Sequence, residues 1–198
     1  AVIGKMFGVL VVRNTQNEIG FLAAFSGKMA GGYHHSIFVP PVFDALTEDS
    51  FLNIGMTELN AINLEIKTLE AATTTDNTEQ IDSLKLRRKN NSVVLQDKLF
   101  DEYIFLNQAG DEKNLRTLFR TFSNTNPPAG AGECAAPKLL QYAFQHNMQP
   151  LAIAEFWWGL SPKSDYWKHG HFYPACQQKC APILSHMLEG IELDIALS

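Results

Sequence analysis

Three cysteines are the residues of this sequence whose positions suggest chemistry. Cys134 follows a glycine-containing loop and begins an expected helix, where unpaired backbone N–H groups and the helix dipole favour a thiolate. Cys176 and Cys180 are four residues apart, so a helical turn would place both thiols on one face. His171 lies five residues before Cys176. Because zinc binds Cys and His side chains in tetrahedral geometry, we predict a zinc site formed by Cys134, Cys176, Cys180 and His171.

A second interpretation keeps these cysteines out of chemistry. Free cysteine is among the residues most often buried in proteins, and a histidine at the surface needs no metal to explain it. A Cys-x-x-x-Cys pair is also less diagnostic of zinc than the tighter Cys-x-x-Cys pair. The sequence therefore leaves open whether the three cysteines bind a metal or only fill the core.

Two basic stretches are candidate RNA contacts. The chain has 16 Lys and Arg against 21 Asp and Glu, a net charge of −5, so any contact with a polyanion must be local. One stretch combines aromatic side chains that can stack on bases with basic ones, namely Tyr166, Lys163, Lys168 and His169. The other contains Arg87 and Arg88. The alternatives are core packing for the aromatic residues and a solvated helix face for the arginines.

The candidate residues depend on an α/β order of elements. Apolar runs at 7–13 and 19–27, divided by a polar turn, predict a β-hairpin. Both runs are apolar on both faces, so we expect a cover on each side of the hairpin. Residues 28–55 are rich in Gly, Pro and His, which indicates an irregular loop. Further along the chain we expect a helix at 115–122, a helix that starts near Cys134, a strand at 150–159 and a helix at 181–189.

A helical hairpin is expected between residues 56 and 107. Its first helix has apolar residues at spacings of three, four and three, the stripe of an amphipathic helix, at Leu59, Ile62, Ile66 and Leu69. A polar break at 72–78 is followed by a second helical stretch, about 79–107. The short break predicts that the second helix folds back on the first.

The order of elements resembles that of the zinc deaminase fold. That fold has a hairpin, a helix with a metal ligand and a carboxylate, a strand, and a helix started by a cysteine pair. The resemblance implies an α/β fold with a three-layer-type mixed sheet, here with an inserted helical hairpin. In deaminases the carboxylate, two residues beyond the first ligand, moves the proton while zinc activates water. Ala136 stands at that position here, so deamination would need an unusual base.

Three segments resemble the N-terminal region of a branch of the RluA-type RNA pseudouridine synthase family. The first consists of pieces between Arg87 and Asn107, namely 87–92, 95–96, 100–103 and 105–107. The second is residues 127–140 (PPAGAGECAAPKLL), and the third is residues 154–159 (AEFWWG) with residues 169–176 (HGHFYPAC). The resemblance spans most of the chain. It implies an accessory domain that precedes a synthase domain and helps it act on structured RNA. The catalytic Asp of that family lies in a His-Arg-Leu-Asp motif, which this chain lacks, so the isomerisation is not assigned to it.

We therefore expect one accessory domain, with a core of residues 1–55 and 108–198 and a helical-hairpin insertion at about 56–107. The expected partners are structured RNA (rRNA or tRNA) and the C-terminal synthase domain of a parent protein. The alternatives are a zinc-dependent deaminase-like hydrolase and a purely structural interaction module. Sparse cysteines, the lack of a signal-peptide pattern and the lack of an apolar run of about 18 residues favour a cytoplasmic protein with no membrane partner.

Overall fold

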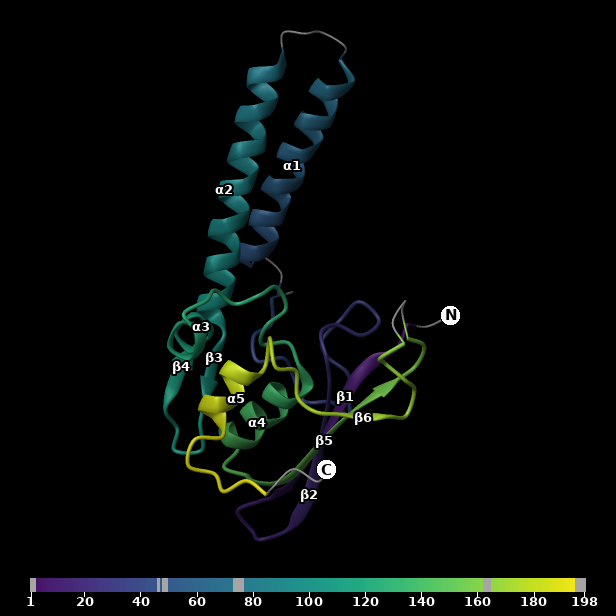
Figure 1. The fold of residues 1–198 in the computed structure, drawn as a ribbon, viewed down its shortest axis with the longest axis vertical. Coiled ribbons are helices and arrows are strands. Elements are labelled where there is room, and N and C mark those ends of the chain that lie inside the picture. Colours follow the sequence, from purple (N-terminus) through teal and green to yellow (C-terminus); the bar gives the residue numbers. More distant parts are fainter. Residues whose placement is uncertain (1–2, 46, 48–49, 73–76, 162–164, 195–198) are drawn as a thin grey trace. The chain divides into compact units, whose positions relative to one another are not determined.

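The structure is a computed structural model that describes residues 3–45, 47, 50–72, 77–161 and 165–194 (Figure 1). The chain divides into two compact units, one formed by Ala1–Asp44 with Tyr103–Ser198 and the other by Ala45–Glu102. We call them the core unit and the hairpin unit. Within the described ranges, no helix combines the length and the apolar composition that crossing a bilayer requires.

The core unit contains a four-stranded antiparallel sheet with the strand order β2-β1-β5-β6. Its strands are β1 (Lys5–Arg13), β2 (Ile19–Phe25), β5 (Gln149–Trp158) and β6 (Phe172–Tyr173). The β1–β2 pair confirms the hairpin predicted from the two apolar runs, and β5 confirms the predicted strand. The hairpin turn is held by Asn14, whose side-chain oxygen accepts the backbone N–H groups of Gln16 and Glu18 at 2.9 Å each.

One face of the sheet is covered by α4 (Ala135–Gln145), and α5 (Ala181–Met187) packs on α4 (Figure 1). The helix comes close to β1 because Gly8 has no side chain. A Cβ at Gly8 would lie 3.0 Å from the Cβ of Ala135 and 3.0 Å from Cδ1 of Leu139. Leu139 is fully buried in this contact. The absence of a side chain at Gly8 therefore fixes how closely α4 packs on the sheet.

The directions of the strands differ from the sequence prediction, which was a three-layer mixed sheet with a cover on both faces. All pairings between the named strands are antiparallel. The chain returns through α4 to place β5 beside β1, so β2 and β5 flank β1 and both run against it. Phe21 and Phe172, on the face away from α4, are 73% and 72% exposed. The α/β class is thus confirmed, while the mixed sheet is wrong for the described strands.

A second, smaller sheet pairs β3 (Ile104–Leu106) with β4 (Glu112–Asn114), and α3 (Leu115–Ser123) follows at once. The helix predicted for 79–107 is therefore too long, because its last residues form β3. Ile104 is exposed and Phe105 is fully buried, which is the alternation of a strand. This short strand was missed because three residues are too few to show a period of two in the sequence.

The hairpin unit is built from α1 (Phe51–Ala71) and α2 (Thr78–Glu102), which lie side by side (Figure 1). Ser50 caps α1, since its side chain accepts the N–H of Asn53 at 3.2 Å. The contact between the helices confirms the predicted helical hairpin. Its apolar seam consists of the buried residues Ile62, Ile66 and Leu84 and the partly buried Leu69 and Ile81.

The contact at Gly8 gives a direct test of the packing. We expect Gly8→Ala to lower the free energy of unfolding by about 1–3 kcal/mol, the usual effect of an extra group in a filled core. Gly20→Ala, on the same hairpin, is the matched control, because a Cβ there meets nothing within 4 Å. Urea denaturation of both variants measures the difference, and equal midpoints for the two would contradict the packing.

Candidate functional site

Cys134 is positioned by the glycine loop that precedes α4. Gly130 and Gly132 have φ angles of 75° and 90°, a region that favours glycine. A Cβ at Gly132 would also lie 2.7 Å from Cδ1 of Tyr103. The loop places Cys134 at the N-cap of α4, as predicted, and its side chain makes no capping hydrogen bond. The thiol is therefore left for another partner.

That partner is Cys180, which is 1% exposed and lies at the N-cap of α5. The two side chains share a hydrogen bond, which lowers the pKa of Cys134 and raises the pKa of Cys180. Cys180 is therefore the donor of this pair, and Cys134 is the acceptor. Burial and the charge of Glu155 act against the lowered pKa of Cys134, while Lys179 and Lys138 favour it.

Cys176 lies one turn before Cys180. The N–H of Cys180 donates to the main-chain oxygen of Cys176 at 3.0 Å, so the predicted helical turn is present although α5 itself begins at Ala181. The Cys176 side chain is exposed. Cys176 is among the causes that raise the pKa of Cys180, so this thiol is within electrostatic reach of Cys180.

Glu155 joins this group and was not among the predicted site residues. It lies on β5 and is only 8% exposed, and its Oε1 accepts the N–H of Ala136 at 3.1 Å. A strand residue thus caps the first turn of α4. Burial raises the pKa of Glu155, and the hydrogen bond from Ala136 partly offsets that effect. The signal in the sequence is a single acidic residue inside an apolar strand. We call Cys134, Cys176, Cys180 and Glu155 the thiol–carboxylate cluster.

A second polar network supports the start of α4. Oε1 of Glu133 accepts hydrogen bonds from the hydroxyls of Tyr33 at 2.9 Å and Tyr103 at 3.3 Å. Burial, followed by the Glu133 charge, raises the pKa of both tyrosines. Lys138 is 4% exposed and donates to the main-chain oxygen of Phe25 at 3.0 Å. The network ties the end of β2 and the loop around Tyr33 to the helix that carries Cys134.

His171, the fourth predicted zinc ligand, is not among the groups that act on the thiols. It is exposed just before β6, and its main-chain oxygen accepts the N–H of Trp157 at 3.0 Å. Across the described residues, no three His, Cys, Asp or Glu side chains already stand in an arrangement that would hold a metal ion. Sulfur and carboxylate oxygen are nevertheless donor types that zinc binds. The zinc site therefore stays a prediction.

The predicted RNA-contact stretch forms an aromatic cluster at the end of β5 and β6. Trp167 stacks on Trp157 with ring centroids 5.2 Å apart and contacts Tyr173 at 4.8 Å. The Tyr173 hydroxyl accepts the N–H of Lys168 at 2.7 Å and donates to the main-chain oxygen of Tyr166 at 2.7 Å. The tyrosine thus fixes the backbone of this segment. Part of the core-packing alternative holds, since Trp157 and Trp167 are only partly exposed.

Several side chains of the same stretch face solvent. Tyr166 is 60% exposed, and Lys168 and His169 are exposed as well. The ring of His169 lies 4.1 Å from that of Trp158, and its Nδ1 accepts the N–H of Gly159 at 3.0 Å. Lys163, the remaining predicted residue here, lies outside the described residues. We call Trp158, Tyr166, Lys168, His169 and Phe172 the aromatic–basic surface.

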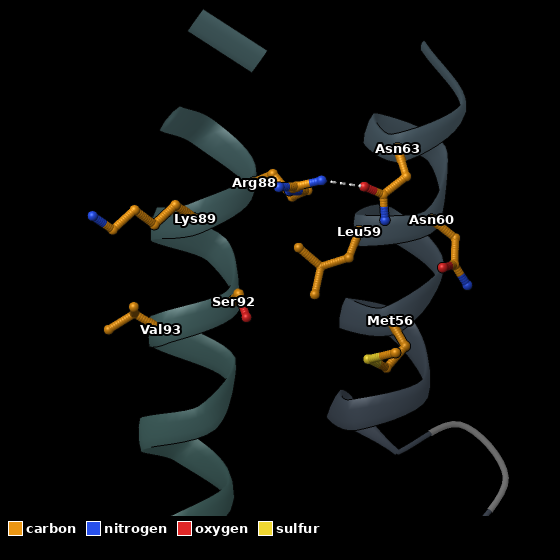
Figure 2. Close-up of a pocket in the computed structure, with 8 residues that line it drawn as sticks. All are labelled: Met56, Leu59, Asn60, Asn63, Arg88, Lys89, Ser92 and Val93. Atoms are coloured by element: carbon orange, nitrogen blue, oxygen red, sulfur yellow. Dashed lines mark hydrogen bonds between the residues drawn. The ribbon is translucent and has the colours of Figure 1, made fainter. Parts of the chain in front are cut away.

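Arg87 and Arg88 belong to the hairpin unit, and both are bound to α1. Arg87 forms an ion pair with Glu58 at 3.0 Å, and Arg88 donates to the side-chain oxygen of Asn63 at 2.7 Å. Figure 2 shows Arg88 reaching across a groove of about 470 Å³ between the two helices, while Lys89 points away from α1. Both arginines contact α1 but are exposed, so an RNA contact by this arm stays a prediction.

The buried lysine predicts a pH-dependent stability. Burial lowers the pKa of Lys138 to about 8 from an ordinary 10.5. The unfolded chain therefore keeps this proton to a higher pH than the folded chain does. As the pH rises, the free-energy cost of burying a charged lysine falls. We expect the free energy of unfolding to rise between pH 7 and 9.5 by about 2 kcal/mol more in wild type than in Lys138→Met. Guanidinium denaturation at both pH values measures this, with Lys89→Met as the control. Parallel profiles for wild type and Lys138→Met would contradict it.

Two of the three segments that carry the resemblance to pseudouridine synthases supply residues of this site. Residues 127–140 form the glycine loop and the start of α4, residues 154–159 contain Glu155, and residues 169–176 lead to Cys176. Among known proteins, no family model, no curated protein and no solved structure matches the chain. The resemblance therefore remains a prediction from these segments.

Proposed function

We propose that this chain is an accessory domain of an RNA pseudouridine synthase and that it positions structured rRNA or tRNA, or packs on the synthase domain, through the aromatic–basic surface. The observation that supports this proposal is the exposure of aromatic rings beside Lys168 and His169, on a segment that resembles the synthase family. Stacking of a base on an aromatic side chain contributes about 1–3 kcal/mol, without a requirement for a particular base.

The chain's own charge favours a local contact over general attraction to RNA. With a net charge of −5, the molecule repels a polyanion at long range. Lys168 and the tilted His169–Trp158 ring pair provide a cation and two rings at one place. Such a surface suits an unpaired or flipped-out nucleotide in a structured RNA, and it suits an aromatic pocket of a partner domain equally well.

The thiol–carboxylate cluster fits a supporting role in the same proposal. Zinc held by Cys134, Cys176 and Cys180 would tie the starts of α4 and α5 together, which a small core unit can use for stability. The rival proposal, a zinc-dependent deaminase-like hydrolase, needs a proton-moving carboxylate. Ala136 provides none, and Glu155 is the buried carboxylate nearest to that peptide.

The RNA contact can be tested by substitution on the aromatic–basic surface. We expect Tyr166→Ala to weaken binding to a hairpin RNA at low salt by about 5- to 100-fold, the equivalent of one lost stacking contact, and Lys168→Glu to weaken it as well. Phe21→Ala removes an equally exposed ring far along the sheet and is the control. Fluorescence anisotropy measures the affinity. Wild-type binding that neither substitution changes would remove the RNA-facing form of the proposal.

The hydrolase alternative has a separate test. We expect zinc-loaded protein to show no turnover of cytidine, adenosine or guanine derivatives, because no carboxylate lies two residues beyond Cys134. Ammonia release measures the reaction. Turnover that Glu155→Gln abolishes would instead support the hydrolase and make Glu155 its proton carrier.

A further inference from the structure

The outer edge of β5 has a free stretch of main chain. In the sheet order β2-β1-β5-β6, β5 lies between β1 and β6. β1 runs beside β5 over its whole length, whereas β6 pairs with it only at Glu155 and Phe156. No strand of the described residues lies beside residues 150–154 on that side. The N–H and C=O groups that point to this edge are therefore free to pair with another strand.

The side chains of this free stretch are apolar and exposed. Its sequence, PLAIA, contains no polar or charged side chain. Leu151 and Ile153 are 40% and 46% exposed, and Ala152 and Ala154 are exposed as well. Soluble monomers usually avoid four consecutive exposed apolar residues on an edge strand, because such an edge adds a further strand. We call residues 150–154 the edge segment.

We propose that the edge segment pairs antiparallel with the edge segment of a second copy of this chain, centred on Ala152. A two-fold axis makes two identical strands antiparallel, as both existing pairings of β5 are. The segment has no charge that would meet its like in the copy. Its free length also matches itself, because β6 closes it at Glu155 and Pro150, which has no N–H, ends it on the other side. This inference goes beyond the proposed function and does not require RNA binding.

The pairing would cover apolar surface that α4 leaves exposed. Ile153 lies opposite Leu10, which faces α4 and is buried, whereas Ile153 is half exposed at the edge of the same face. Leu151 is skipped in the register between β1 and β5. In a pairing centred on Ala152, Ile153 of each copy lies opposite Leu151 of the other. Two apolar cross-strand pairs would thus form from side chains that now contact water.

The interface is small, so we expect a weak dimer. Five residues from each copy bury far less than the roughly 800 Å² that each partner contributes to a standard interface. Each copy also has a net charge of −5, which opposes association at low salt. We expect a dissociation constant of about 10–100 µM, which falls as the salt concentration rises.

The dimer would also arrange the aromatic–basic surfaces, a consequence that does rest on the proposed function. Ala152 lies on the two-fold axis, and Trp158 is six residues further along β5. At about 3.3 Å per residue, the surfaces of the two copies would lie roughly 40 Å apart, at opposite ends of the joined strands. An RNA long enough to reach both would bind more tightly than a short one.

The association can be measured by analytical ultracentrifugation of the full chain from about 5 to 300 µM. We expect a reversible monomer–dimer equilibrium that Ala152→Lys weakens by about 10-fold or more, because two like charges would face each other on the axis. Ile19→Lys places the same charge on β2, at a residue that is 66% exposed, and should leave the equilibrium unchanged. A chain that stays monomeric over this range would overturn the proposal and leave the edge to a strand of another protein. A dimer that both variants affect alike would overturn it too, because the contact would lie elsewhere.

A crosslink tests the position of the contact without adding a charge. Cβ atoms directly opposite each other in an antiparallel pair are about 4.5–5.5 Å apart, close to the spacing in a disulfide. We expect Ala152→Cys, in a Cys176→Ser background that removes the exposed thiol, to form a covalent dimer with oxidised glutathione. Ile19→Cys in the same background is the control and should stay monomeric on a non-reducing gel. Equal crosslinking of both variants, or none in Ala152→Cys where the chain is dimeric, would overturn the pairing.

Discussion

The close packing of the start of α4 on β1 and β5 is the constraint on which the site depends. Gly8 lets the helix approach β1, and Glu155 of β5 accepts the N–H of Ala136 in the first turn. These two contacts fix the distance between α4 and the sheet and the position of the N-terminal end of α4. Cys134, at its N-cap, then meets Cys180 at the start of α5. A side chain at position 8 would press on Ala135 and Leu139, so the helix or these side chains would have to give way.

Local signals in the sequence predicted much of this arrangement. The hairpin, the helix that starts after Cys134 and the strand that contains Glu155 each follow from a run of residues whose pattern is complete in itself. The cysteine spacing likewise predicted the turn between Cys176 and Cys180. These features depend on neighbours in the chain, so a reading of short segments was enough to find them.

The parts that sequence reasoning missed depend on residues far apart in the chain. Glu155 looked like one polar residue in an apolar strand, because its partner, Ala136, becomes a neighbour only once β5 pairs with β1. Tyr33 and Glu133 are 100 residues apart, and no local pattern links them. His171 was assigned to the zinc site by distance along the chain, which does not determine where its exposed side chain lies. The antiparallel sheet follows from how α4 returns the chain, which element order alone left open.

The proposed accessory domain has two distinct parts, the thiol–carboxylate cluster and the aromatic–basic surface. Thiols and a buried carboxylate join three elements of the core unit, while rings and cations gather at the end of β5 and β6. The strand β5 links the two, because Glu155 and Trp158 are three residues apart on it. The arginines of the hairpin unit contact α1 within that unit.

The central claim is that the aromatic–basic surface is the part of this chain that contacts structured RNA. Ultraviolet crosslinking of the chain to a hairpin RNA, followed by mass spectrometry of the crosslinked peptides, tests it most directly. We expect crosslinks at Trp158, Tyr166 or Phe172, whose rings are exposed. Crosslinks only at other residues, or none at all, would contradict the account.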